Sequence, residues 1–502
     1  MGTEGSENVA VTAAPAIELV PVMRERLADL ETPVSAFAKL RVLGGAFLLE
    51  SAEGGERMGR YSFIGVAPRA VLHFRDGEVV AERKPDDVAF AVPRVANVLA
   101  MTNAPAPDPL ASLRAELARY RRAPQPGLPR FSGGAVGFIG YEAARRFERL
   151  PTAANDPYAP WGMPEAVFGI YDTVVAFDHL RHTLTVLAHD DTAAPGAAAR
   201  TIDRVFAALD APLPPFARGS IGPVDIRPNG APEEYMRRVA KARELIAEGD
   251  CIQIVLAQRF DVTPAPDPLA LYRALRHVNP SPYMFLLETA PATLVGASPE
   301  PFVRVEGGKV VMHPIAGTRP RGDDEAEDAA KEAELRASEK ERAEHVMLVD
   351  LTRNDIGRVS LPGTVKVKEL MRVDRFSHVM HLTSVVEGEL ELELDALDAF
   401  RACFPAGTVS GAPKIRAMER IAELETDQRG PYAGAVGYLG FDGALDTCIT
   451  IRTATIAHGV CRIQAGAGIV ADSDPAAEEA ETRAKARALL RAIELAGGEL
   501  SR

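Results

Sequence analysis

Short apolar runs that are typical of β-strands recur through both halves of the chain, and helical stretches lie between them. Strand-like alternation begins near Ile17, and turn residues bound runs such as GGAFLLES (44–51), YSFIGV (61–66) and VVAFDHL (174–180). No repeat at a fixed period is visible, which argues against a solenoid. Because helices and short strands are mixed in both halves, we predict an α+β fold.

A long proline-rich stretch, APLPPFARGSIGPVDIRPNGAP (211–232), marks the main break in this pattern. After it, Pro232 and the following acidic residues predict a helix over about 232–248, since proline and negative charge favour a first helical turn. A last helix is expected at 475–496, before a pair of glycines. The chain is therefore divided into a disordered tail (1–16), an N-terminal domain (17–210), a linker (211–231) and a C-terminal domain (232–498).

The charge balance argues against a nucleic-acid partner. The chain has 57 Lys and Arg against 70 Asp and Glu, a formal net charge of −13, whereas binding to a phosphate backbone needs clustered basic residues. A small anionic substrate is compatible with this charge, because a local pocket can be positive on an acidic protein.

No apolar run approaches the ~18 residues of a membrane span, and the N-terminus lacks the regions of a signal peptide. Four scattered cysteines predict reduced thiols in a cytoplasmic protein.

Two helices carry carboxylates on the stripe where apolar side chains are expected. Glu341 and Glu344 are three residues apart in a helix around 339–355, and the same face continues into leucines. Glu478 and Glu481 repeat this spacing in the last helix. For either helix alone, a solvated surface helix is the favoured interpretation. The repetition makes a Mg²⁺ site as good an explanation, because an unpaired buried carboxylate is costly and Mg²⁺ prefers carboxylates plus water.

Four further features could bind an anion or take part in chemistry. GAGI (466–469) and FPAGTVSGAPKIRAME (404–419) place glycines where backbone amides can approach an anion, although ordinary turns explain each of them as well. Arg452 lies within an expected strand at 446–456 among small and apolar residues. This suggests recognition of a carboxylate, with an outward-facing charge as the alternative. A lone strand histidine such as His381 is more often a hydrogen-bonded core residue than a catalyst.

Six motifs follow one another in a single order. They are GASPEPF (296–302), PIAGTRPRG (314–322), the run from Glu341 to Asp355, SHVMHLTS (377–384), PAGTVSGAPK (405–414) and GAGIVADSDP (466–475) with the acids after it. Together they resemble the chorismate-utilising enzymes, and most closely the large subunit of anthranilate synthase, strongly over 232–495 and more loosely over 31–190. The resemblance implies a large mixed α/β fold with a β-sandwich-like core flanked by helices, and a C-terminal catalytic domain.

The resemblance also implies an activity, a set of roles and a cofactor. The activity is amination of chorismate with ammonia and loss of pyruvate to give anthranilate, the first step of tryptophan biosynthesis, in a heterotetramer. The implied catalytic residues are Glu300 as the general acid, His381 and Thr318. The implied substrate contacts are Thr408, Tyr432, Arg452, Gly466, Ala467, Gly468 and Lys485. Mg²⁺ would be held directly by Glu344 and Glu481, and through water by Glu341 and Glu478.

A regulatory ligand and a partner subunit are implied in the same way. LLES (48–51) and NPSPYMFLL (279–287) look like the family's tryptophan feedback pocket, with the contacts Glu50, Ser51, Pro282, Tyr283, Met284 and Phe285. These segments lie on opposite sides of the linker, so tryptophan would clamp the two halves. No cysteine occupies a G-x-C-x-G turn and nothing after Gly498 could hold an amidotransferase domain. A separate glutamine amidotransferase subunit is therefore the implied partner.

Two positions distinguish activities within this family. Gln253 stands where the water-using isochorismate and salicylate synthases carry a lysine base, and glutamine cannot deprotonate water, so ammonia is the implied nucleophile. Ala316 stands where many aminodeoxychorismate synthases carry a nucleophilic lysine, which favours anthranilate as the product. An aminodeoxychorismate synthase and a non-catalytic tryptophan-sensing protein are kept as alternatives.

Overall fold

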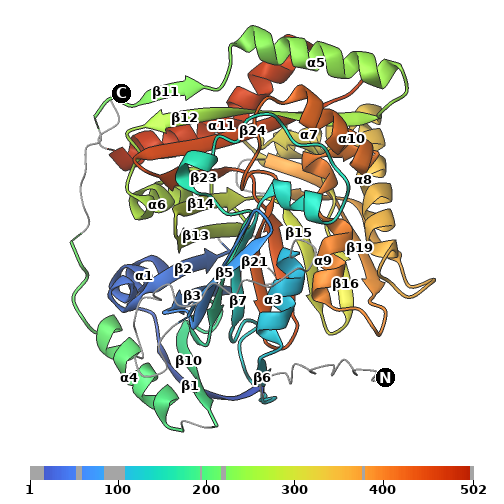
Figure 1. Ribbon diagram of the computed structural model, residues 1–502. Helices are drawn as coiled ribbons and strands as arrows, with labels where there is room; N and C mark the ends of the chain where they lie inside the picture. The colour runs from blue at the N-terminus through green and yellow to red at the C-terminus, as the bar shows by residue number, and fades with distance from the viewer. Residues whose placement is uncertain are drawn as a thin grey trace, which may run out of the picture.

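Two large, mostly antiparallel sheets form the centre of the molecule (Figure 1). The computed structural model describes residues 16–51, 59–83, 108–192, 195–215, 222–375 and 379–497. The predicted disordered tail lies outside the described residues, apart from its last position. In this part of the chain the first sheet has 13 strands and the second has 11.

The first sheet combines strands from the two ends of the sequence. In order across the sheet its strands are β11 (Asp225–Pro228), β12 (Gln253–Thr263), β24 (Val460–Ile469), β23 (Thr453–Ala457), β14 (Ala292–Ser298), β13 (Tyr283–Thr289), β2 (Gly45–Glu50), β3 (Tyr61–Val66), β9 (Thr173–Asp178), β10 (Thr183–Asp191), β1 (Ile17–Leu27) and β6 (Tyr120–Arg122), with the short β20 (Gly411–Ala412) beside β12.

The second sheet is mixed in the same way. Its strands are, in order, β17 (Ile315–Pro320), β19 (Val379–Glu389), β16 (Lys309–Met312), β15 (Pro301–Glu306), β22 (Leu445–Ile449), β21 (Ala435–Gly440), β7 (Gly134–Ile139), β8 (Ala166–Tyr171), β4 (Ala70–Arg75) and β5 (Glu78–Arg83), with β18 (Lys366–Arg375) beside β19.

Helices flank the two sheets, with α1, α4 and α6 on one side of Figure 1 and α8, α9 and α10 on the other. The α-helices are α1 (Pro33–Leu40), α3 (Pro109–Leu117), α4 (Ala197–Leu209), α5 (Pro232–Ala247), α6 (Pro268–Val278), α7 (Glu325–Ala337), α8 (Glu339–Gly357), α9 (Ala396–Cys403), α10 (Lys414–Leu424) and α11 (Pro475–Gly497). The described ranges also contain four 3₁₀ turns, which are η1 (Arg41–Leu43), η2 (Tyr141–Arg146), η3 (Ala159–Trp161) and η4 (Gly407–Val409). None of the helices in the described ranges is long and apolar enough to cross a membrane.

Aromatic side chains fill the space between the two sheets. Phe47, Phe63 and Phe285 of the first sheet share a buried cluster with Phe138 and Tyr438 of the second. Successive strand residues point to opposite faces, so the neighbours of the three first-sheet rings point outward to a second cluster formed with α1, α4, α6 and α11. The predicted α+β fold with a sandwich-like core flanked by helices is confirmed.

The helix predicted after the central break forms as expected, but the break does not separate the sheets. α5 begins at Pro232, and the Glu234 carboxylate accepts a hydrogen bond from the Ala231 N–H at 3.2 Å, which caps the helix. Within the predicted linker, β11 pairs with β12. β2 pairs with β13, and β7 pairs with β21, so each sheet joins strands from both sides of 211–231.

Candidate active site

Glu300 lies where the chain passes from β14 of the first sheet to β15 of the second. The Thr408 hydroxyl, on η4, donates a hydrogen bond to Glu300 Oε2 at 2.9 Å. Burial raises the pKa of the Glu300 carboxyl, while this hydrogen bond and the charges of Lys485 and Arg452 pull that pKa down. A carboxyl with a raised pKa can hold a proton and donate it to a leaving group.

Arg452 lies in a turn, and the prediction of one strand over 446–456 is wrong. The run forms two strands, β22 and β23, which belong to opposite sheets, and Arg452 stands between them with a φ of 49°. The alternation of the run is real, but its two ends find different pairing partners, β15 and β21 on one side and β14 and β24 on the other. The turn brings the guanidinium within electrostatic reach of Glu300, Tyr432 and Glu481.

The glycine segment predicted as a loop is the end of β24. Gly466, Ala467 and Gly468 pair with β12, because β12 is long enough to continue the ladder beside them. β23 pairs with β24 only as far as Ile463. Among the described residues, no strand covers the other edge of β24 along this segment, so the segment retains an edge where backbone groups can meet a ligand.

Tyr432 and Lys485 meet this segment of β24. A Cβ atom added at Gly466 would stand 2.8 Å from the Tyr432 hydroxyl, so the missing side chain is what allows the two to approach. The Lys485 ammonium donates a hydrogen bond to the Gly466 carbonyl at 3.0 Å. Tyr432 itself is buried, at 7% exposure. The predicted substrate contacts Tyr432, Gly466 and Lys485 therefore converge.

His381 and Thr318 are opposite each other on β19 and β17. A bulge at Gly317, with a φ of 66°, sets this register. His381 Nδ1 lies 3.1 Å from both the Thr318 hydroxyl and the Gly317 carbonyl. The carbonyl can only accept, so in this bond Nδ1 carries the proton and Nε2 has the lone pair. Burial lowers the pKa of His381, which favours the neutral imidazole.

The four predicted metal ligands lie on α8 and α11. Burial and the neighbouring Glu341 charge raise the pKa of Glu344. Burial also raises the pKa of Glu478, with Glu481 adding to the effect. Two of the four have basic partners, since Glu341 pairs with Arg319 at 3.0 Å and Glu481 pairs with Lys485 at 2.7 Å.

No three acidic, histidine or cysteine side chains of the described ranges form a ready metal centre. The donor chemistry nevertheless fits Mg²⁺, because the two carboxylates within each helix repel one another with only partial neutralisation by lysine and arginine. Mg²⁺ commonly keeps several waters and takes one or two protein carboxylates. These residues can therefore hold the ion together with water and a substrate oxygen.

The two segments predicted to bind tryptophan are paired strands. β2 and β13 run antiparallel, with Met284 opposite Glu50. A cavity of about 590 Å³ has all six predicted residues in its lining, namely Glu50, Ser51, Pro282, Tyr283, Met284 and Phe285. The same lining contains Arg60 and Asp446, which the sequence motifs do not indicate. Their only sequence signal is a charged residue at the beginning of a strand.

The Glu50 carboxyl is engaged on the helix side of its strand. Tyr272 of α6 donates a hydrogen bond to it, and Arg276 of α6 lies 3.5 Å from it. Burial raises the pKa of Glu50, partly offset by the Arg276 charge and the Tyr272 hydrogen bond. The other residues of β2 explain this direction: Leu48 belongs to the cluster packed under the helices, whereas Phe47 lies between the sheets.

A model of the chorismate binding enzyme family matches residues 47–491. The chain belongs to this family. An anthranilate synthase component 1 from Streptomyces coelicolor is 48% identical over 495 residues, which cover 95% of this chain and 89% of the relative. One from Acetivibrio thermocellus is 43% identical over 493 residues, 95% of this chain and 96% of the relative.

A solved structure extends the similarity to three dimensions. The crystal structure of anthranilate synthase component I from Streptococcus pneumoniae superposes with a TM-score of 0.75 at 37% identity, covering 87% of this chain and 95% of that one. The predicted resemblance to anthranilate synthase large subunits is confirmed, and so is the prediction of an enzyme that uses chorismate.

Proposed function

We propose that this family member is the chorismate-using component of an anthranilate synthase. The observation that carries the proposal is the Thr408–Glu300 hydrogen bond of 2.9 Å, next to Arg452 and Tyr432. Glu300, a proton donor, therefore lies beside Arg452 and Tyr432, which can bind a carboxylate. The similarity to proteins named anthranilate synthase component 1 over 95% of the chain supports this choice of reaction.

In the first half of the proposed reaction, ammonia adds to the chorismate ring and a hydroxyl group departs. Hydroxide is a poor leaving group, so it needs a proton as the bond breaks. Glu300 supplies that proton, since burial raises the pKa of its carboxyl and so favours the protonated form. Gln253 lies beside Glu344 and cannot deprotonate water, which agrees with ammonia as the nucleophile.

In the second half, pyruvate leaves and the ring becomes aromatic. This step removes a ring proton, and His381 is the group we assign to it. Its Nδ1–H bond to the Gly317 carbonyl leaves the Nε2 lone pair as the base. The Thr318 hydroxyl, 3.1 Å from Nδ1, helps to fix the orientation of the ring.

Substrate binding falls to the groups around β24. Arg452 and Tyr432 would bind the enolpyruvyl carboxylate, with backbone amides of 466–468 and the Lys485 ammonium as further contacts. Mg²⁺ would be held by Glu344 and Glu481 directly, and by Glu341 and Glu478 through water. When bound, the ion supplies positive charge that fixes the ring carboxylate of chorismate.

We further propose a glutamine amidotransferase subunit as the source of ammonia, in a cytoplasmic heterotetramer. Tryptophan is the proposed feedback inhibitor, bound in the cavity of about 590 Å³ between β2 and β13 and the second sheet. Tyr283 and Phe285 offer aromatic walls for an indole, and Ser51 offers a polar contact. Inhibition requires that tryptophan bind one conformation better than another.

One assay tests the proposal directly. Purified chain is mixed with chorismate, Mg²⁺ and an ammonium salt, and anthranilate is followed by its fluorescence. Formation of anthranilate and pyruvate in equal amounts is the expected result. Consumption of chorismate to a non-aromatic amine would instead establish an aminodeoxychorismate synthase. An unchanged chorismate pool would leave only the tryptophan-sensing alternative.

A further inference from the structure

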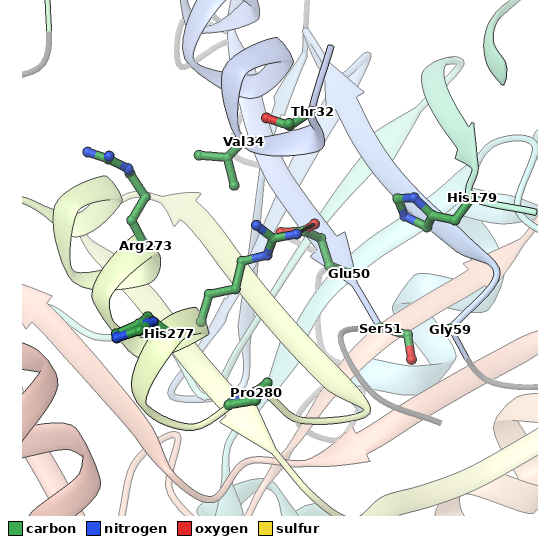
Figure 2. Close-up of a pocket in the computed structure, with 10 residues that line it drawn as sticks. Thr32, Val34, Glu50, Ser51, Gly59, His179, Arg273, His277 and Pro280 are labelled. Carbon is green, nitrogen blue, oxygen red and sulfur yellow. Dashed lines mark ion pairs between the residues drawn. The ribbon is translucent and has the colours of Figure 1, made fainter. Parts of the chain in front are cut away.

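A second cavity, of about 670 Å³, lies next to Glu50 on the side of β2 that faces α6. Its lining consists of Thr32, Val34, Glu50, Ser51, Gly59, His179, Arg273, Arg276, His277 and Pro280. Figure 2 shows Glu50 near the middle, with Arg273 and His277 of α6 on one side and His179 on the other. The volume falls within the roughly 300–1,000 Å³ typical of small-molecule sites.

The charge of this lining is opposite to that of the whole chain. The ten lining residues include two arginines, Arg273 and Arg276, and one acid, Glu50, although the chain carries a net charge of −13. The positive field extends across the cavity. Burial is the largest cause that lowers the pKa of His179, and the charge of Arg276 is the second. Such a concave positive region concentrates small anions on an otherwise acidic surface.

The pairing of Arg276 with Glu50 uses little of the hydrogen-bonding capacity of the guanidinium. Its distance to the Glu50 carboxylate is 3.5 Å, longer than the ~2.7–2.9 Å of a charge-assisted hydrogen bond. Glu50 is instead bound by the Tyr272 hydroxyl. The planar guanidinium has five N–H donors and suits two-point contact with a carboxylate or a phosphate.

We propose that this cavity binds a small ligand through a carboxylate or phosphate group, with Arg276 as the principal contact and Arg273 and His277 as further basic contacts. The site is separate from the proposed tryptophan cavity, because only Glu50 and Ser51 line both. Glu50 acts here as an internal competitor, since its carboxylate faces the same guanidinium that the ligand would use.

This competition predicts effects of opposite sign for two neighbouring substitutions. Arg276→Gln removes the main contact and should weaken anion binding by at least about tenfold, the size expected for loss of a charge-assisted hydrogen bond. Glu50→Gln keeps an acceptor for Tyr272 but removes the competing charge, so it should tighten binding severalfold. A loss of folding cannot produce tighter binding.

The test uses calorimetric titration of the full chain with inorganic phosphate and, separately, with citrate, at constant ionic strength. Arg237→Gln on α5, whose guanidinium lies 4.0 Å from Glu234 outside the cavity, is the matched control. We expect the control to bind like the wild type, and the tighter of the two probes identifies phosphate or carboxylate as the preferred group. Binding does not depend on the proposed activity, so the two hypotheses fail separately.

Three results would overturn the proposal. The first is that neither probe binds the wild type at millimolar concentration. The second is that Arg276→Gln binds as well as the wild type, or loses no more affinity than Arg237→Gln. The third is that Glu50→Gln weakens binding, which would show that cavity shape and not charge controls it.

Discussion

Thr408→Val should move the alkaline limb of the pH–rate profile upward. The Thr408 hydroxyl donates to Glu300 Oε2 at 2.9 Å and stabilises the charged form, so its removal raises the pKa of Glu300. A hydrogen bond to a charged group contributes about 1.5–3 kcal/mol, and one pKa unit corresponds to about 1.4 kcal/mol. Because the Glu300 side chain is partly exposed to solvent, we take the lower end of this energy range, which corresponds to a pKa shift of about one unit.

The sign follows from the role of the acid. A general acid works in its protonated form, so activity is present below its pKa and is lost as the pH rises through it. Raising the pKa of Glu300 therefore extends activity to higher pH. The measurement is kcat/KM for anthranilate formation against pH, because this ratio reports the free enzyme, with the concentration of NH₃ itself held constant at every pH.

A matched substitution separates this effect from a general loss of stability. Thr289→Val removes a hydroxyl that donates to the Ala292 carbonyl at 3.1 Å, in a turn outside the candidate site. We expect its alkaline limb to coincide with that of the wild type. An alkaline limb that stays in place in Thr408→Val, or moves to lower pH, would refute the assignment of Glu300 as the acid under Thr408 control.

The remaining predictions concern the acid, the metal, the ammonia source and the inhibitor. Glu300→Gln should lower kcat by ~10²–10⁴-fold with a smaller change in KM, and a wild-type kcat would show that another group is the acid. Glu344→Gln and Glu481→Gln should abolish activity while the fold persists by circular dichroism; normal turnover of both at low Mg²⁺ would exclude them as ligands. The isolated chain should use ammonium, better at high pH, and should not use glutamine; glutamine-dependent product from the pure chain would remove the need for a partner. Ser51→Phe should keep catalysis but weaken inhibition by tryptophan, as judged from inhibition curves at matched chorismate.

Helix limits and the order of motifs are predictable from this sequence because their causes are local. Proline with acids in the first turn begins α5, and α11 ends at Gly497, within the glycine pair that predicted its end. Strand pairings are not predictable in this way, because their causes lie far away in the sequence. Nothing within 446–456 shows that its two halves join different sheets, since strand pairing depends on partners far away in sequence. The same limit applies to 466–469, which is a strand only because β12 continues beside it.

Strand alternation alone predicts which face of β2 the Glu50 side chain lies on. The period of two places Glu50 on the face of Leu48, away from Phe47 and the space between the sheets. Its carboxyl therefore meets α6, and a tryptophan ammonium between the sheets would depend mainly on backbone carbonyls near 50–51. What alternation cannot supply is the identity of the partners, since Tyr272 and Arg276 are more than 200 residues away along the chain. One acidic residue thus forms part of two cavities on opposite faces of a strand. A charge change at position 50 should therefore alter ligand binding in both cavities.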